Sequence, residues 1–318
     1  MDTRKTVIVM PELTQEQKKR LEAFSGFRFV YDPKPGMDKI RNASVIMGNL
    51  PPAVLQEAKA LEFLQLTSSG ADAYCKPGVL KEGTLLASAT GAYNQSVAEH
   101  AFAATLCLMK NLHLYRDDQF QKIWSDHGKV GTLRGATVLI AGLGDIGVDY
   151  AAMVKAMGAY VIGVKRRPAE CPACVDELHL TGDLEELLPR ADVVCSILPG
   201  TEATWHLFDR EHFGKMKKSA IFINVGRGTA QDEEALIEAL RDGTIAAASV
   251  DVTEKEPLAK ESGLWELPNL LLTPHVAGGA HMDVTLDLIA EICVSNFEKF
   301  AEGKPVRNEI DFSTGYKK

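Results

Sequence analysis

The sequence has no long hydrophobic run and no excess of positive charge. None of its apolar stretches approaches the roughly twenty residues that a membrane-spanning helix needs, so no membrane association is expected. Its formal net charge at pH 7 is −8, which argues against a nucleic-acid partner, because such a surface needs clustered basic residues. The chain enters a strand pattern directly, without the apolar core of a signal peptide, so we expect a cytoplasmic protein.

Cysteine is scarce, with six in 318 residues, which is too few for a disulfide framework in a chain of this length. Four lie singly, mostly in apolar segments, and are expected to be small core residues: Cys75, Cys107, Cys195 and Cys293. Cys171 and Cys174 form a C-x-x-C with His179 nearby, which leaves open a redox pair or part of a metal site. No second cysteine pair completes a zinc set and no H-E-x-x-H spacing occurs, so the sequence predicts no metal.

What is present is the composition of a globular protein, with 46% hydrophobic and 25% charged residues and enough length for two domains. Short apolar runs separated by turn signals predict a small α/β unit in the first hundred residues. Its expected elements are strands Thr6–Met10, Phe27–Tyr31, Ser44–Met47 and Phe63–Thr67 and a helix from Thr14 to about Phe24, opened by a Thr14–Gln17 capping box. Ser96 and Glu99 predict another capping box, at the start of a long apolar helix to about Asn111.

From Thr137 onward, predicted strands alternate with predicted helices, which indicates a doubly wound parallel sheet. The six expected strands are Val138–Ala141, Tyr160–Val164, Asp192–Ile197, Ile221–Val225, Ala246–Val250 and Leu270–Thr273. The expected helices are Val148–Met157, Leu184–Leu188, Arg210–Lys215, Glu233–Arg241 and Asp283–Glu302. The tail Val306–Lys318 is too short for a domain and is expected to fold back on the N-terminal unit. We therefore predict a discontinuous domain, 1–97 with 289–318, and a dinucleotide-binding domain, 98–288.

The stretch Ala136–Arg167 contains a dinucleotide fingerprint. Gly142, Gly144 and Gly147 stand in G-x-G-x-x-G spacing between a predicted strand and a predicted helix, inside a unit of about thirty residues. Glycines at these positions allow a tight turn, close approach to a pyrophosphate and close helix–strand packing, and the pyrophosphate then lies at the positive end of the helix. The residues predicted to form this loop are Gly142, Leu143, Gly144, Asp145, Ile146 and Gly147. Asp145 is expected to complement the helix end.

The residues after the second strand of this unit are basic. Enzymes that use NAD usually have Asp or Glu here to accept hydrogen bonds from the ribose hydroxyls, whereas this chain has Lys165, Arg166 and Arg167. A carboxylate would repel a 2′-phosphate, and a guanidinium binds one through paired, charge-assisted hydrogen bonds. The sequence therefore predicts NADP, with NAD possible; the alternative is a solvated basic loop.

Three charged or titratable residues follow successive predicted strands: Arg227 in NVGRG, Glu256 in DVTEKEP and His275 in LTPH. In a parallel sheet these loops emerge at one edge, so we expect the side chains to converge. A proton donor, a carboxylate to tune it and a guanidinium to hold an anion form a hydride-transfer site for hydroxy acids. Separately, the turn Ser68–Asp72 has small residues with exposed amides and can hold an anion.

With these motifs the chain resembles the D-isomer-specific 2-hydroxyacid dehydrogenases over nearly its whole length. The segments that carry the resemblance are GLGDIG (142–147), INVGRGTAQDEEALIEAL (223–240), DVTEKEPL (251–258), LPNLLLTPHVAGG (267–279), SVAEHAFA (96–103) and LPGTEATWHLF (198–208). It implies a Rossmann dinucleotide domain plus a smaller flavodoxin-like substrate domain, and a homodimer. Two positions depart from the family pattern, because Thr253 stands where an aromatic residue is usual and Lys165 where NAD-using members carry an acidic one.

The resemblance also implies roles for individual residues. Arg227, Glu256 and His275 would be catalytic, and the Ser69 and Gly70 amides would help Arg227 and His275 to bind the substrate. Further cofactor contacts are implied at Pro199, Thr204, Val225, Gly226 and Asp251. In the expected reaction, Arg227 binds and polarises a small 2-oxo acid and His275, oriented by Glu256, donates the proton.

The implied activity is an NADPH-preferring 2-oxo-acid reductase of the glyoxylate/hydroxypyruvate type. Two other functions stay open on the sequence. One is a phosphoglycerate dehydrogenase-like enzyme, since short forms lack an extra regulatory domain. The other is a non-enzymatic dinucleotide-sensing corepressor of the C-terminal-binding-protein kind, which has the same Arg, Glu and His; the absence of disordered tails argues against it.

Overall fold

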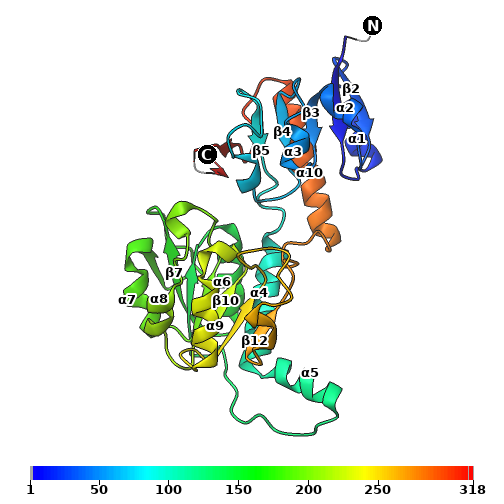
Figure 1. The fold of residues 1–318 in the computed structure, drawn as a ribbon. Coiled ribbons are helices and arrows are strands. Elements are labelled where there is room, and N and C mark those ends of the chain that lie inside the picture. The colour runs from blue at the N-terminus through cyan, green and yellow to red at the C-terminus, as the bar shows by residue number, and fades with distance from the viewer. Residues whose placement is uncertain (1–2, 314, 318) are drawn as a thin grey trace. The chain divides into compact units, whose positions relative to one another are not determined.

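The computed structural model describes residues 3–313 and 315–317. The chain divides into two compact units. The first unit contains the chain up to Tyr93 and again from Ala280, so that blue and cyan elements are joined by orange and red ones (Figure 1). The second unit is Asn94–Gly279. The divisions thus fall after residues 93 and 279, earlier than the expected 97 and 288.

The first unit is built on a five-stranded parallel sheet in the order β2-β1-β3-β4-β5. Its strands are β1 (Lys5–Val9), β2 (Phe27–Tyr31), β3 (Ala43–Met47), β4 (Phe63–Gln65) and β5 (Leu85–Ala87). Its other elements are α1 (Gln15–Glu22), α2 (Met37–Arg41), α3 (Pro52–Leu55), η1 (Asp72–Tyr74), α10 (Asp283–Ala301), β13 (Ile310–Asp311) and β14 (Tyr316–Lys317). This strand order is that of a flavodoxin-like sheet, as expected.

Both faces of this sheet are buried. One face packs against α1 and α10 and contributes Val7, Val9, Val45, Met47 and Phe63. The other packs against α2 and α3 and contributes Ile8, Ile46, Leu64 and Leu86. Successive strand residues point to opposite faces, which explains why these strands read as continuous apolar runs. The predicted capping box is confirmed, since Gln17 N donates to Thr14 Oγ1 at 3.2 Å and Thr14 N to Gln17 Oε1 at 3.0 Å.

The second unit has a seven-stranded parallel sheet in the order β12-β11-β10-β9-β6-β7-β8, the order of a Rossmann fold. Its strands are β6 (Thr137–Ala141), β7 (Tyr160–Lys165), β8 (Glu177–Leu180), β9 (Val193–Ser196), β10 (Ile221–Asn224), β11 (Ala247–Val250) and β12 (Leu270–Leu272). The doubly wound prediction is confirmed, but the count of six strands was wrong. The missed strand, β8, is a four-residue edge strand without a fully buried residue, so it lacks the apolar run that marks the others.

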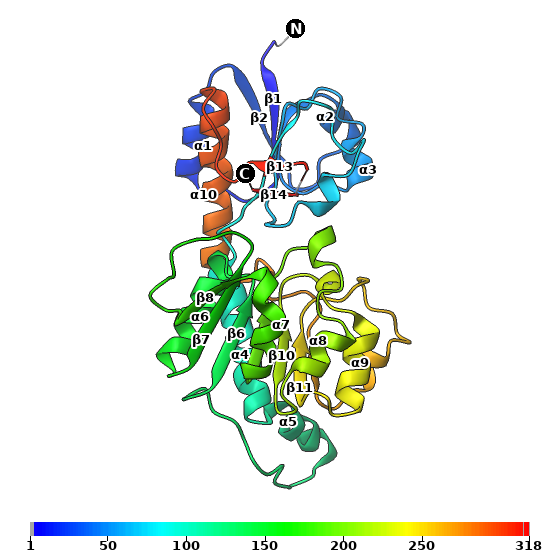
Figure 2. The same ribbon diagram turned by 90° about the vertical axis from the view of Figure 1, so that its left-hand side faces the viewer.

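Helices cover both faces of this sheet. The helices of the second unit are α4 (Asn94–Met109), α5 (Leu112–Gln121), α6 (Asp145–Ala156), α7 (Leu184–Leu187), α8 (Arg210–Lys215) and α9 (Glu233–Arg241), with short 3₁₀ segments η2 (Thr181–Asp183), η3 (Leu188–Arg190), η4 (Glu202–Thr204), η5 (Gly228–Ala230) and η6 (Gly263–Glu266). Figure 2 shows α7, α8 and α9 on one face of the sheet. α4 and α6 pack on each other, and α4 contacts β10 and β11. The site-bearing strands are therefore held from both sides.

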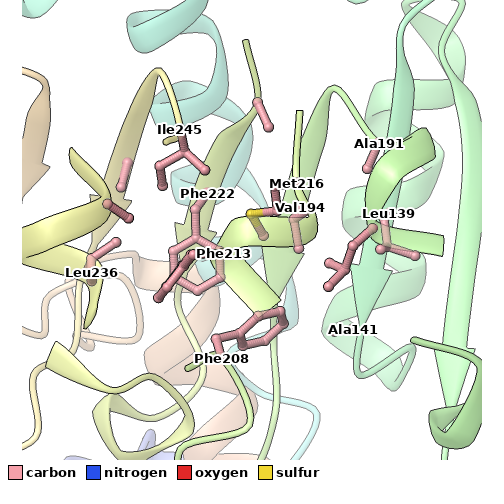
Figure 3. Packing of buried hydrophobic residues seen from close by; sticks show 14 of the residues in the cluster. Leu139, Ala141, Ala191, Val194, Phe208, Phe213, Met216, Phe222, Leu236 and Ile245 are labelled. Carbon is pink, nitrogen blue, oxygen red and sulfur yellow. The ribbon is translucent and has the colours of Figure 1, made fainter. Parts of the chain in front are cut away.

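An aromatic cluster forms the centre of the core under α8 and α9. The ring of Phe222 on β10 lies 4.9 Å from that of Phe208 and 5.2 Å from that of Phe213 (Figure 3). Such pairs contribute about 0.5–1.5 kcal/mol each beyond their buried area. Because Phe222 precedes the loop that carries Arg227 by only a few residues, this packing fixes the position of that strand end.

One predicted helix start was wrong. α4 begins at Asn94, so Ser96 and Glu99 lie inside the helix and form no capping box. The Ser96 hydroxyl instead donates to the Ala277 carbonyl oxygen at 2.8 Å, and Glu99 accepts from Gln95 at 2.7 Å. Ser96 thus ties α4 to the segment that follows His275. In the described part of the chain, every helix is too short or too polar to cross a bilayer.

Candidate active site

The glycine-rich turn joins β6 to α6 at the point where the strand order reverses. Gly142 has φ +98°, a backbone conformation that side chains rarely adopt, and a Cβ there would lie 2.6 Å from the Ile197 carbonyl oxygen. Gly144 is the N-cap of α6, so the first backbone N–H groups of the helix, starting at Asp145, have no acceptor within the helix. The turn therefore fits the pyrophosphate of a dinucleotide.

The basic residues predicted to select NADP lie at the end of β7. Lys165 is the last residue of the strand, and the exposed residues Arg166 and Arg167 follow it. Neither arginine forms an ion pair with any residue that the structure describes. Two guanidinium groups are thus uncommitted at the strand next to the glycine-rich turn, where charge-assisted hydrogen bonds to a phosphate are available.

The other predicted cofactor residues follow three adjacent strands at the same edge of the sheet. Pro199 and Thr204 follow β9, Val225 and Gly226 follow β10, and Asp251 follows β11. The Thr204 hydroxyl accepts a hydrogen bond from Thr201 N at 3.0 Å. Thr204 is 8% exposed, so its side chain is part of the turn. Their contacts with a cofactor stay predictions.

Arg227, Glu256 and His275 follow β10, β11 and β12, which are neighbours in the sheet. The structure brings Glu256 and His275 together, because His275 Nδ1 lies 2.7 Å from Glu256 Oε2. The other carboxylate oxygen accepts from Thr253 N at 3.2 Å. The carboxylate thus fixes the orientation of the imidazole and leaves Nε2 as the nitrogen for a substrate. Arg227 Nη1 donates to the Gly226 carbonyl oxygen at 2.9 Å.

The loops of Arg227 and Glu256 touch at Gly228. A Cβ at Gly228 would lie 2.0 Å from both the carbonyl carbon and the carbonyl oxygen of Thr253, far inside van der Waals contact. The backbone after Arg227 is therefore pressed against the backbone three residues before Glu256. This close approach was not anticipated from the sequence, where Gly228 stands only as part of a motif.

Replacing Gly228 with alanine should separate the two loops. Overpacking against backbone atoms costs about 3 kcal/mol, so we expect a lower melting temperature together with a loss of activity, measured by calorimetry and steady-state kinetics. Gly214, inside α8, is the control, because a Cβ there would meet no other atom within 4 Å. Gly214→Ala should keep the activity and stabilise by about 0.5–1 kcal/mol. Equal behaviour of the two variants would contradict the contact.

Asp251 holds the loop that carries His275. Its side chain is 2% exposed, and its carboxylate accepts from Thr273 Oγ1 at 2.6 Å, Val276 N at 2.9 Å and Ala277 N at 3.0 Å. Its backbone oxygen accepts from His275 N at 2.7 Å. His275 itself has φ +53°, a strained conformation that persists only where the surroundings impose it. This supporting role could not be predicted from spacing, and the family resemblance implied only a cofactor contact.

A cavity of about 640 Å³ lies beside the Glu256–His275 pair. Apolar side chains form much of its wall, among them Leu258, Trp265 and Leu272. His100 of α4 has Nε2 3.2 Å from Thr273 Oγ1, so it contacts the same hydrogen-bonded loop.

His179 is not available as a ligand partner for the C-x-x-C segment, because its imidazole binds the Glu177 carboxylate. Hydrogen bonds from Arg190, and to a smaller extent from His179 and Tyr160, lower the pKa of Glu177 to about 2. Cys171 and Cys174 are free thiols. Burial raises the pKa of the Cys195 thiol well above its usual range, in keeping with a core residue.

Among residues 3–313 and 315–317, one group offers three possible metal ligands within 4.8 Å of one another: His206, Asp232 and Glu254. Local contacts already account for them. Asp232 is the N-cap of α9 and accepts from Ala235 N at 3.1 Å, and Glu254 Oε1 accepts from Glu233 N at 2.9 Å and lies 3.1 Å from His206 Nε2. The group joins the segments after β9, β10 and β11.

Ser69 and Gly70, predicted to bind a substrate carboxylate, lie in the first unit after β4. The Ser68 hydroxyl donates to the Gly70 carbonyl oxygen at 2.9 Å and shapes the turn. Within the described residues the backbone amides of Ser69 and Gly70 have no acceptor. Two adjacent amide donors are thus available to an anion.

The second unit combines a Rossmann sheet, a glycine-rich turn at its switch point and a carboxylate–imidazole pair at neighbouring strand ends. These features define a nicotinamide-dependent dehydrogenase. Comparison with known proteins identifies which kind. Residues 102–277 match the family model "D-isomer specific 2-hydroxyacid dehydrogenase, NAD binding domain", and the chain belongs to this family. It is an oxidoreductase that transfers hydride between a nicotinamide dinucleotide and a 2-oxo or 2-hydroxy acid.

Individual relatives are similar to this chain over most of its length. A glyoxylate reductase from Thermofilum pendens is 31% identical over 247 residues, covering 76% of this chain and 72% of the relative. A family protein from Aeromonas salmonicida has a crystal structure with TM-score 0.85 and 33% identity, covering 97% of this chain and 99% of that one. An NADPH-dependent glyoxylate/hydroxypyruvate reductase from Sinorhizobium meliloti, solved with NADP and sulfate, has TM-score 0.82 and 26% identity, covering 98% and 100%.

Proposed function

We propose that this chain reduces a small 2-oxo acid of the glyoxylate or hydroxypyruvate type with NADPH as the preferred donor. The observation that carries the proposal is the 2.7 Å contact between His275 Nδ1 and Glu256 Oε2 at the edge of a dinucleotide-binding sheet. An imidazole oriented by a carboxylate is suited to proton transfer at a carbonyl oxygen. The named activities of the T. pendens and S. meliloti relatives support the substrate class.

In the proposed reaction, a nicotinamide dinucleotide held by the turn of Gly142, Gly144 and Gly147 would supply the hydride for reduction of the carbonyl group. Arg227 binds the substrate carboxylate and polarises the 2-oxo group, which offsets the negative charge that develops on oxygen. His275, protonated, donates from Nε2 to that oxygen, and Glu256 keeps the ring in place. The amides of Ser69 and Gly70, in the first unit, can also hold an anion.

A panel of 2-oxo acids with NADPH and NADH side by side tests the proposal. We expect the highest kcat/KM for glyoxylate or hydroxypyruvate with NADPH. Preference for 3-phosphohydroxypyruvate would indicate a phosphoglycerate dehydrogenase-like enzyme instead. Tight dinucleotide binding without turnover of any 2-oxo acid would indicate a dinucleotide sensor and overturn the proposal.

We further propose that two copies of the chain associate through the α5 arm, residues 110–132. Figure 1 shows α5 and the loop after it extending away from the sheet of the second unit. Five large apolar side chains are exposed on this arm: Leu112, Phe120, Ile123, Trp124 and Val130. Trp124 is fully exposed and Phe120 is 72% exposed. Several exposed large apolar side chains within one short segment are typical of an interface, and cyclic dimers are the commonest symmetric assembly.

Replacing Phe120 and Trp124 together with serine should convert dimers into monomers, because large aromatic side chains dominate interface energetics. Sedimentation velocity at micromolar concentration measures the change. Phe312, an aromatic of the first unit that is 44% exposed, is the matched control, and Phe312→Ser should remain dimeric. A monomeric wild-type protein would rule out this assembly.

The compartment we propose is the cytoplasm. All six cysteines are free, including the exposed Cys171. Free thiols without any disulfide fit a reducing compartment.

A further inference from the structure

The turn that carries Arg227 rests on two fully buried amide side chains. Asn224 is the last residue of β10 and Gln231 follows η5, and both are 0% exposed. Asn224 Nδ2 donates to the Arg227 carbonyl oxygen at 3.0 Å, and Asn224 Oδ1 accepts from Gly226 N at 3.0 Å. One side chain therefore binds the backbone on both sides of the Arg227 Cα.

Gln231 fixes the Asn224 amide in turn. Asn224 Nδ2 also donates to Gln231 Oε1 at 3.0 Å, so it binds two acceptors, as many as its two hydrogens can serve. If the Asn224 amide rotated by half a turn, its oxygen would face two acceptor oxygens and its nitrogen would face the Gly226 N–H. The network thus permits a single orientation of Asn224.

Stability does not explain a glutamine at position 231. Its Nε2 is buried and has no hydrogen-bond partner among the residues that the structure describes. A buried donor without an acceptor destabilises the folded state, and an apolar side chain of similar size avoids that penalty. The useful contact of Gln231 is the one that its carbonyl makes with Asn224.

We infer that Gln231 is a positioning residue for Arg227 and acts through Asn224. The inference rests on the proposed function, in which Arg227 binds the substrate carboxylate. Without the Gln231 acceptor, the Asn224 side chain loses one of its three hydrogen bonds and holds the Arg227 turn less firmly, so the guanidinium is less well placed for the substrate. The dinucleotide loop after β6 is built from other residues and should be unaffected.

The test is Gln231→Met, which keeps the size of the side chain and removes both polar atoms. We expect KM for glyoxylate to rise about tenfold, a loss typical of a misplaced binding group. The KM for NADPH should change less than about twofold. The melting temperature should stay equal or rise, because the unpaired buried donor is removed. Gln65, the other fully buried glutamine, has both ends paired, with Leu66 O at 2.8 Å and Asn296 Nδ2 at 2.7 Å. Gln65→Met should lower the melting temperature instead.

A double-mutant cycle with Arg227→Ala identifies the route of the effect. If Gln231 acts through Arg227, adding Q231M to R227A should cause no further loss in kcat/KM for glyoxylate. Additive losses, a fall in the melting temperature of Q231M, failure of Q231M to fold, or an unchanged KM would each overturn the inference. If R227A itself left KM and kcat for glyoxylate unchanged, the proposed role of Arg227 would fail first, and the two failures are thus distinguishable.

Discussion

Replacing His275 with glutamine should lower kcat for 2-oxo-acid reduction by about two to four orders of magnitude, the range that a positioned general acid contributes. Glutamine keeps a polar group of similar reach but cannot deliver a proton to the developing alkoxide. The KM for the dinucleotide should change less than about twofold, because the glycine-rich turn after β6 binds it without His275. Stopped-flow and steady-state absorbance of the reduced nicotinamide measure both quantities.

The matched control for His275 is His281, an exposed histidine a few residues further along the chain. His281→Gln should keep the wild-type kcat for reduction. A His275→Gln enzyme with undiminished turnover would end the assignment.

Replacing both Arg166 and Arg167 with alanine should lower kcat/KM for NADPH by about a hundredfold or more, since each charge-assisted hydrogen bond contributes about 1.5–3 kcal/mol. Both guanidinium groups are exposed and form no ion pair within the described residues, so their removal should leave the fold intact. The kcat/KM for NADH, which lacks the 2′-phosphate, should change less than about threefold, because no binding partner is lost.

The matched control for this pair is Arg210, an exposed arginine at the start of α8 that pairs with Glu238. Arg210→Ala should leave the ratio of the two specificity constants at its wild-type value. A wild-type enzyme that prefers NADH, or a double variant that loses NADH and NADPH equally, would contradict selection by the 2′-phosphate. In that case the residues after β7 would be a solvated basic loop.

The sequence predicts the elements whose residues form a local pattern, and it misses those that depend on contacts between distant residues. Buried strands such as β6 and β10 read as apolar runs, and the glycine spacing of 142–147 marks the switch point, so the Rossmann sheet was predictable. β8 was not, because a four-residue edge strand without a fully buried residue lacks the apolar run that marks the other strands. Ser96 was misread because a local capping pattern competed with a hydrogen bond to Ala277, far away in the sequence.

The residues of the candidate site also divide into those that the sequence predicts and those that it does not. Arg227, Glu256 and His275 stand out as charged residues directly after predicted strands. The groups that support them do not. Asp251 holds the His275 loop through three acceptor contacts, and Gln231 reaches the Arg227 turn only through Asn224. These are tertiary contacts between buried polar groups, and no periodicity or spacing in a single sequence encodes them.

The contact between Gly228 and the Thr253 backbone has a consequence for engineering. Segments 226–230 and 251–256 meet so closely at this contact that no Cβ fits between them, so a loop transplanted from a relative would meet a neighbour that was not shaped for it. Chimaeras that exchange only one segment should therefore be poorly active, whereas chimaeras that exchange both as a pair should work.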